Sequence, residues 1–259
     1  MDMDPLQVFK EIYGKVPDWV QAMHDFVPEG LHHYTALRTN AMKDGALTRK
    51  EKELILVGVN AARRYETSMI YHTQGALDAG ATALEIADTV LATVISRGLP
   101  AWLEGRKAVQ FALEHTISGV TAGPDGSVEG GATTTAIDHL SLPTLTTVEE
   151  CDSYYVQTFS AIPEWAALMR SFSPDIYVSY TNLRNAALAE QSIPPYLKEL
   201  VLMAINASER YPLGVDIHVN GAMAKGATKA QLAECLLTAV LTAGIPAWFT
   251  GYEALTRLK

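Results

Sequence analysis

Residues 52–105 read KELILVGVNAARRYETSMIYHTQGALDAGATALEIADTVLATVISRGLPAWLEG, and this stretch decides the fold because the chain contains it twice. Residues 198–251 read KELVLMAINASERYPLGVDIHVNGAMAKGATKAQLAECLLTAVLTAGIPAWFTG and align with the first copy without a gap, at an offset of 146 residues. A long internal repeat means that each copy is one structural unit of a duplicated protein.

The duplication continues upstream of the quoted stretch. Trp19 matches Trp165, and the pair Leu37-Arg38 matches Leu183-Arg184. We therefore divide the chain into a first unit, residues 1–118, and a second unit, residues 147–259. Between them, residues 119–146 are rich in Gly, Thr and Ser, which is typical of a linker.

Composition limits the class of protein. The chain has 259 residues and a net charge of −9, which argues against nucleic-acid binding because such binding needs a clustered basic face. No run of about 18 uncharged apolar residues predicts a membrane span. The acidic N-terminus does not resemble a signal peptide, so a cytoplasmic protein is expected. The two cysteines, Cys151 and Cys235, have no metal-binding or redox spacing.

The sequence predicts helices throughout both units. A short helix follows Pro17 and Pro163, and a second covers about residues 30–42 and 176–188. The markers of the remaining helices are a capping box at Thr48, Pro194-Pro195, glycine C-caps at Gly80 and Gly226, N-caps at Thr82 and Thr228, and the helix-opening Pro100 and Pro246. No segment shows sustained strand alternation, so the predicted fold class is all-α.

A glutamate and a histidine recur at the same spacing in both units. Glu53 precedes His72 by 19 residues, and Glu199 precedes His218 by 19 residues. If neighbouring antiparallel helices bring each pair together, the carboxylate fixes the tautomer of the imidazole. The other ring nitrogen is then free to take or give a proton near neutral pH.

Three further residues share the helical face of the histidines. Tyr65 and Ser68 precede His72 by seven and four positions, and Tyr211 precedes His218 by seven. We predict that they contact a substrate.

The repeated pattern resembles the carboxymuconolactone decarboxylase family, which includes the alkylhydroperoxidase D-type proteins. Its elements are K-E-L, Y-x-x-S-x-x-x-H, G-A-x-x-x-G-A-T and G-x-P-A-W. The resemblance implies an all-helical fold that assembles into a ring. Single-unit members form trimers or hexamers, so three duplicated chains would form a pseudo-hexameric homotrimer.

The chain departs from the peroxidase branch of that family at two positions. That branch carries C-x-x-C before the histidine, whereas here Tyr65 and Ser68 occupy the cysteine positions of the first unit, and Tyr211 and Gly214 those of the second. Without a thiolate there is no disulfide exchange, so a thiol peroxidase is not expected.

The resemblance and the Glu–His pairs together predict a cofactor-independent, decarboxylase-like enzyme acting on a small carboxylated lactone or keto acid of aromatic catabolism. Three alternatives remain open: an isomerase, a hydrolase, or a non-catalytic ring-forming protein that binds a ligand. The glutamates could instead be structural, and one Glu and one His per unit are too few ligands for a metal. The copies also differ around the histidine: Pro212 and Gly214 are expected to disturb the start of the second copy's helix, which favours the first site.

Overall fold

The computed structural model describes residues 4–118 and 142–258, and within these ranges the protein is helical with no strand. The first unit contains α1 (Pro5–Tyr13), α2 (Asp18–Phe26), α3 (Pro28–Met42), α4 (Arg49–Arg63), α5 (Glu66–Asp78), α6 (Ala83–Arg97) and α7 (Leu99–Ser118). The second contains α8 (Val148–Phe159), α9 (Glu164–Phe172), α10 (Pro174–Leu188), α11 (Pro195–Ser208), α12 (Pro212–Ala224), α13 (Lys229–Ala243) and α14 (Ile245–Arg257). The all-α prediction is confirmed.

Helix boundaries follow the capping chemistry of the sequence. Thr48 and Thr82 each form a complete capping box with the glutamate three residues later, and Thr228 does so with Gln231. Gly80 and Gly226 have φ values of 85° and 89°, the left-handed conformation expected just beyond a helix.

Two expectations need correction. Helices α1 and α8 are not predicted from the sequence, although α8 begins with its own capping box at Thr147. Pro212 and Gly214 are predicted to disturb α12, yet α12 has the same length as α5. Pro212 occupies the first helical turn, where a missing N–H has no cost, and Gly214 in the same turn allows close contact with Asn206, since a Cβ atom there would collide with Asn206 Oδ1.

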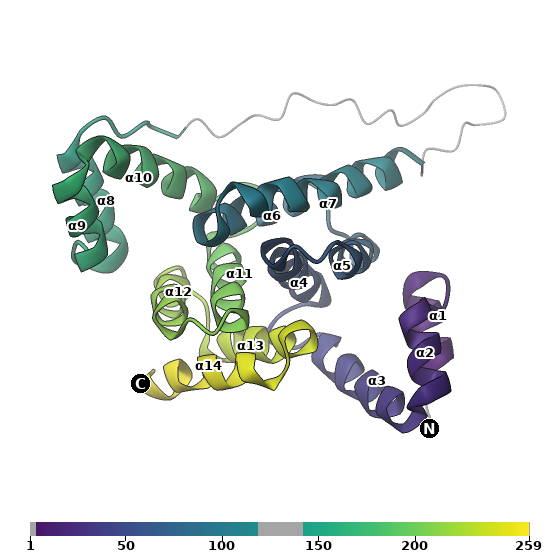
Figure 1. The fold of residues 1–259 in the computed structure, drawn as a ribbon. Helices are drawn as coiled ribbons and strands as arrows, with labels where there is room; N and C mark the ends of the chain where they lie inside the picture. The colour runs from purple at the N-terminus through teal and green to yellow at the C-terminus, as the bar shows by residue number, and fades with distance from the viewer. Residues whose placement is uncertain (1–3, 119–141, 259) are drawn as a thin grey trace, which may run out of the picture.

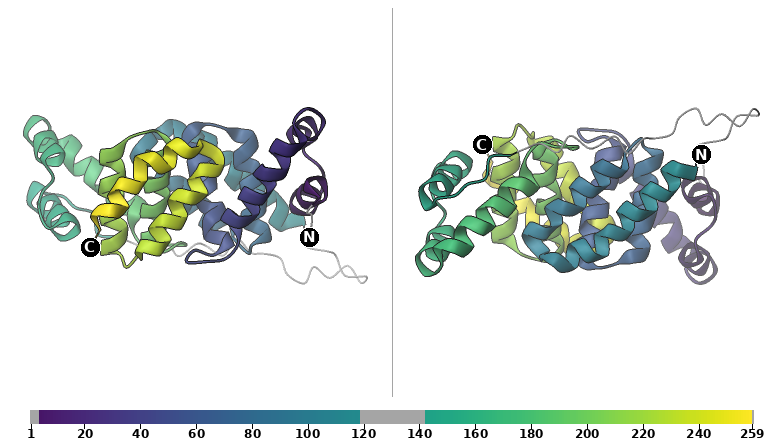
Figure 2. Two further views of the ribbon diagram at one scale, coloured as in Figure 1. Left: turned by 90° about the horizontal axis from the view of Figure 1, so that it is seen from below. Right: turned by 90° about the horizontal axis from the view of Figure 1, so that it is seen from above.

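The helices form a central block with two arms. Helices α4–α7 and α11–α14 make up the block, whereas α1–α3 and α8–α10 project from its opposite ends (Figures 1 and 2). Each arm reaches the other unit, because α3 contacts α13 and α10 contacts α6. Most of the predicted linker lies outside the described residues, and the boundaries of the two units remain a proposal.

A single apolar core spans both units. Leu54 and Val57 of α4 belong to the same buried cluster as Leu200 and Val201 of α11. Each arm has its own smaller cluster: Phe9, Val20 and Leu31 are buried in the first, and their repeat equivalents Tyr155, Ala166 and Tyr177 in the second. The block therefore folds as one body, because neither unit buries its apolar surface alone.

Two buried lysines join the units. Lys52 Nζ lies 3.0 Å from Glu234 Oε2, and Lys198 Nζ lies 2.5 Å from Asp88 Oδ1. Each acidic side chain also accepts two backbone N–H groups of the loop before the other unit's lysine helix: Ala46 and Leu47 donate to Glu234, and Ser192 and Ile193 donate to Asp88. These contacts fix the relative position of the two units. No helix of the described chain is long and apolar enough to cross a membrane.

Candidate active site

A tight helical hairpin positions each Glu–His pair. Helix α4 carries Glu53 near its start and α5 carries His72, and the chain reverses between them at Arg64, which has a left-handed φ of 57°. Gly75 lets α5 approach α4 closely, since a Cβ atom there would lie 2.6 Å from Glu53 Oε1. Gly221 does the same beside Glu199 in the second unit.

The structure brings both predicted pairs into hydrogen-bond contact. His72 Nδ1 lies 2.7 Å from Glu53 Oε2, and His218 Nδ1 lies 2.7 Å from Glu199 Oε2. Both glutamates are fully buried. When Nδ1–H donates to the carboxylate, Nε2 of the same ring carries the lone pair. Both histidines line a cavity, so this nitrogen is the one available to a ligand.

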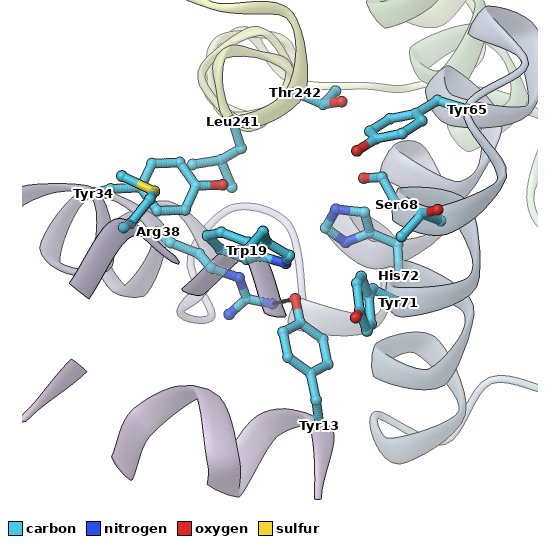
Figure 3. A pocket seen from close by; sticks show the side chains of 12 residues that line it. Tyr13, Trp19, Tyr34, Arg38, Tyr65, Ser68, Tyr71, His72, Leu241 and Thr242 are labelled. Atoms are coloured by element: carbon cyan, nitrogen blue, oxygen red, sulfur yellow. Dashed lines mark hydrogen bonds between the residues drawn. The ribbon is translucent and has the colours of Figure 1, made fainter. Parts of the chain in front are cut away.

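The first cavity has a volume of about 300 Å³ and lies where α5, the first arm and α13 meet. The imidazole of His72 faces the space between Arg38 and Tyr65, with Ser68 beside it (Figure 3). Its remaining lining residues are Tyr13, Trp19, Met23, Tyr34, Thr67, Tyr71, Leu241 and Thr242.

The second cavity has a volume of about 280 Å³ and is built from equivalent positions. Its lining residues are Ile95, Ser96, Arg97, Trp165, Tyr180, Arg184, Asn206, Tyr211, Leu213, Gly214, Ile217 and His218.

Each cavity is completed by the other unit. Leu241 and Thr242 of α13 close the first cavity, whereas Ile95 and Ser96 of α6 close the second. Thr242 also donates to Asn60 Oδ1 behind the first cavity. The two sites therefore depend on the contact between units, because the other unit supplies two of the residues that line the first cavity and three of those that line the second.

Among the predicted substrate contacts, Tyr65, Ser68 and Tyr211 all line a cavity. Three residues that differ between the copies do not line a cavity. Glu66 pairs with Lys107, Asp216 pairs with Arg257, and Pro212 only begins α12. These residues lie on α5 and α12, the helices that carry the histidines, but they do not face the cavities.

Sequence reasoning missed the arginine in each cavity. Arg38 and Arg184 are both almost fully buried, with exposed fractions of 6% and 3%, and each lines a cavity beside its histidine. They belong to α3 and α10, far in sequence from the histidine helices. Their signal was present in the repeat, since Leu37-Arg38 matches Leu183-Arg184, and a cation that recurs on a buried helical face needs a reason.

The second site has strongly perturbed ionisation. Burial opposes ionisation of Glu199, but the His218 hydrogen bond and the charges of Lys225 and Arg184 outweigh it and lower the pKa of Glu199 to about 2. Burial lowers the pKa of His218, against the pull of Glu199. His218 is therefore neutral and Glu199 ionised near pH 7, the state in which Nε2 can accept a proton.

In the first site, burial raises the pKa of Tyr13 to about 12, although the charge of Arg38 works in the opposite direction. Its hydroxyl, which accepts a hydrogen bond from Arg38 Nη2 at 3.3 Å, stays protonated. Among the described residues, no group of three or more His, Cys, Asp or Glu side chains is arranged to hold a metal ion.

Fold and site together define an all-helical tandem-repeat protein with two cavities, each containing a buried Glu–His pair and a buried arginine. Residues 28–111 and 174–257 each match the model of the carboxymuconolactone decarboxylase family. The chain belongs to this family, and thus to a group of decarboxylase-like proteins.

Two solved structures from Burkholderia xenovorans LB400 are similar to the chain. A candidate gamma-carboxymuconolactone decarboxylase subunit shares 20% sequence identity over 100% of both chains, with a TM-score of 0.63, and so has the same fold. A candidate carboxymuconolactone decarboxylase shares 31% identity, over 44% of this chain and 89% of its own, with a TM-score of 0.42. A search of curated proteins found no match.

Proposed function

We propose that the protein is a cofactor-independent acid/base enzyme that acts on a small carboxylated lactone or keto acid. The observation that supports this proposal is the orientation of each imidazole, with Nδ1 held by a buried carboxylate and Nε2 left for a cavity of substrate size. General acid–base catalysis needs this arrangement and no metal.

The proposed reaction is a decarboxylation next to an activating carbonyl. The bond between the substrate and its carboxylate carbon breaks, and CO₂ leaves. The electron pair moves onto the carbonyl oxygen as an enolate. Nε2 of His72 or His218 takes a proton from solvent and gives it to the carbon, which restores the carbonyl and returns the ring to its starting state. Arg38 or Arg184 would stabilise the enolate or hold a carboxylate.

Peroxide reduction by thiols has no support in these cavities. Ser68 and Gly214 stand where a reactive cysteine would be needed. The two cysteines of the chain, Cys151 and Cys235, lie outside both cavities, and burial raises the pKa of each thiol. A raised pKa keeps a thiol protonated and unreactive.

We also propose that three chains assemble into a ring in the cytoplasm. The arms expose large apolar side chains, with Phe26 84% and Phe172 83% exposed, and such surface favours burial against another chain. Light scattering after size exclusion measures the mass, and a monomer would refute the ring.

The function is tested by incubating the protein with a panel of carboxylated lactones and keto acids. Released CO₂ and deuterium incorporated from D₂O into the product report decarboxylation and carbon protonation separately. The double variant His72→Gln/His218→Gln should lose both signals by about 10²-fold or more. His33→Gln, which alters an exposed histidine outside the cavities, is the matched control.

Product analysis separates the alternatives. A rearranged or hydrolysed product without CO₂ would replace the decarboxylase by an isomerase or a hydrolase using the same pair. Equal activity of the double variant and wild type would refute the acid/base mechanism altogether. Ligand binding without turnover of any compound would favour a non-catalytic binding protein.

A further inference from the structure

Arg184, which lines the second cavity, has buried side-chain nitrogens without a hydrogen-bond partner. Its side chain is 3% exposed and lines the cavity beside His218, yet Nε and Nη2 have no hydrogen-bond partner. The guanidinium lies 5.3 Å from the Phe159 ring centroid and also faces Tyr154, whose pKa burial raises and Arg184 lowers. A buried cation with unmet donors is costly unless a ligand supplies the acceptors.

The equivalent arginine of the first cavity is already engaged. Arg38 donates to the Tyr13 hydroxyl and lies 3.6 Å from Glu53 Oε1. Phe159 occupies the position of Tyr13 in the second unit and offers a ring but no acceptor oxygen. The exchange of Tyr13 for Phe159 therefore removes one acceptor from the surroundings of Arg184, although Tyr154 still interacts with the guanidinium.

The charge of Arg184 lowers the pKa of Glu199, but the direct contacts of this carboxylate are with His218 and Lys225. Lys225 Nζ lies 2.7 Å from Glu199 Oε1 and His218 holds Oε2, so both oxygens are occupied. In the first unit Ala79 stands at the position of Lys225, and Glu53 Oε1 has no hydrogen-bond partner, only ion pairs with Arg38 and Arg49 at 3.6 and 3.8 Å. His218 and Lys225 thus occupy both oxygens of Glu199, and Nε and Nη2 of Arg184 keep unmet hydrogen bonds that another anion could accept.

The side of the second cavity that α12 provides is less polar than its counterpart on α5. Three positions that carry Thr67, Ser68 and Tyr71 in the first cavity carry Leu213, Gly214 and Ile217 in the second. Trp165 adds a flat apolar surface. A ligand for this cavity needs one anionic end and a planar apolar body.

We propose that Arg184 anchors the carboxylate of a planar monocarboxylate, such as an aromatic or conjugated acid, and that this specificity belongs to the second cavity and not to the first. The carboxylate would accept from Nε and Nη2 side by side, a bidentate geometry that suits guanidinium. The ring would lie against Trp165 and Ile217, next to His218. This proposal names the substrate anchor of the function proposed above and rests on it, but binding can be measured without turnover.

The test uses benzoate as the probe and the tryptophan of each cavity as the reporter. Trp19→Phe leaves Trp165 to report the second cavity, and Trp165→Phe leaves Trp19 to report the first. Trp102 and Trp248 pack against the core and provide a constant background in both variants. Benzoate should bind the second cavity about tenfold or more tightly than the first, and neutral benzamide should show no such preference.

Variants of the two arginines test whether Arg184 causes the preference of benzoate for the second cavity. In the Trp19→Phe background, Arg184→Met should weaken benzoate binding by about tenfold or more, and Arg184→Lys should restore only part of it because an ammonium cannot form the bidentate contact. Arg38→Met should leave this binding unchanged. The proposal is overturned if benzoate and benzamide quench the fluorescence of Trp165 equally. It is also overturned if Arg184→Met binds benzoate as tightly as the Trp19→Phe parent.

Two exchanges of a single hydroxyl test the same idea without removing a buried charge. Phe159→Tyr should give Arg184 an internal acceptor and weaken benzoate binding in the second cavity. Tyr13→Phe should free Arg38 and strengthen benzoate binding in the first. If neither exchange changes the affinity, Arg184 is not the anchor. If the wild-type protein binds benzoate as predicted but turns over no compound of the panel, the proposed function is refuted and this inference stands.

Discussion

In the first unit, Glu53 is held by His72 and faced by Arg38 and Arg49 at 3.6–3.8 Å, whereas in the second, Glu199 is held by His218 and by Lys225 at 2.7 Å. The extra cation comes from a different position in each unit: Pro195 matches Arg49, and Ala79 matches Lys225. A buried carboxylate needs a compensating charge, but several positions can supply it.

The comparison shows which parts of the repeat are constrained. The Glu–His distance is the same in both sites, although the two cavities share few side chains apart from the histidine, the arginine, one tryptophan and two tyrosines. Residues that set the backbone and the pair agree between copies, whereas many of the other residues that line the cavities differ. This division is what the proposal of a separate specificity for the second cavity rests on.

The largest expected difference lies in the ion pairs between units. Lys198 and Asp88 are 0% and 3% exposed in their side chains, whereas Glu234, the partner of Lys52, is 29% exposed. Lys198→Met leaves Asp88 charged and buried, which should cost about 3–5 kcal/mol of unfolding free energy. Lys52→Met should cost less than half as much, because water can solvate Glu234.

Urea denaturation of both variants measures this difference. Arg257→Met, which alters exposed ion pairs with Asp216 and Glu253 within the second unit, is the control and should cost less than about 1 kcal/mol. Equal losses for Lys198→Met and Lys52→Met would show that exposure of the acidic partner does not decide the cost.

The second prediction concerns the carboxylates behind the histidines. Replacing Glu53 and Glu199 together by Gln removes the negative charge that stabilises an imidazolium, so turnover should fall by about 10²-fold or more. Each single variant should remove only the part of the turnover that its own cavity contributes. The kcat of Glu53→Gln and of Glu199→Gln therefore apportions activity between the units, and unchanged kcat in the double variant would contradict the role given to the glutamates.

How far the sequence predicts this molecule depends on whether a feature is local. Thr48, Thr82 and Thr228 cap their helices through residues three positions away, so the pattern is legible in the chain itself. The Glu–His pairs were predictable because the repeat displays the same spacing twice and the two helices are consecutive. Helix α1 was not predicted although its signals are local as well, since Asp4 caps it and Pro5 opens its first turn.

The cavities could not be predicted because they are assembled from distant segments. Arg38 reaches His72 from the arm, and Leu241 reaches it from the other unit. The exchange of Tyr13 for Phe159 matters only because each ring lies beside a buried guanidinium, which is a tertiary fact. The expectation that Pro212 would disturb α12 was wrong because a proline in a first helical turn requires no hydrogen bond.

A third prediction follows from ionisation in the second site. The pKa of His218 lies below 6.5 in the folded protein because burial disfavours its charged form, so the unfolded chain binds this proton first as pH falls. As far as His218 is concerned, the free energy of unfolding is therefore highest above pH 6.5 and falls below it, by at most about 1.4 kcal/mol per pH unit for one proton. Glu199 adds a further loss below pH 4.5, because its folded pKa is about 2.

Urea denaturation at several pH values between 6.5 and 4.5 measures this slope. His218→Gln removes the titrating group and should flatten the curve in that interval. A slope that is unchanged in His218→Gln would mean that other groups cause the acid sensitivity of the protein.

The smallest effect on stability is expected where a glycine lets two helices meet. A Cβ atom on Gly221 would lie 2.7 Å from Glu199 Oε2, the oxygen that holds His218. Gly221→Ala must therefore displace the carboxylate, but alanine is favoured over glycine inside a helix by about 1 kcal/mol, which offsets the strain. Unfolding free energy should change by less than about 1 kcal/mol, while activity of the second cavity falls by about tenfold because the imidazole loses its orientation. The control is Gly30→Ala on α3, where the atoms nearest to the added Cβ would lie at 3.8 Å. This variant should gain the helical stability of alanine without losing activity. If Gly221→Ala retains full activity, the position of Glu199 does not control the imidazole, and the two units differ in their ligands alone.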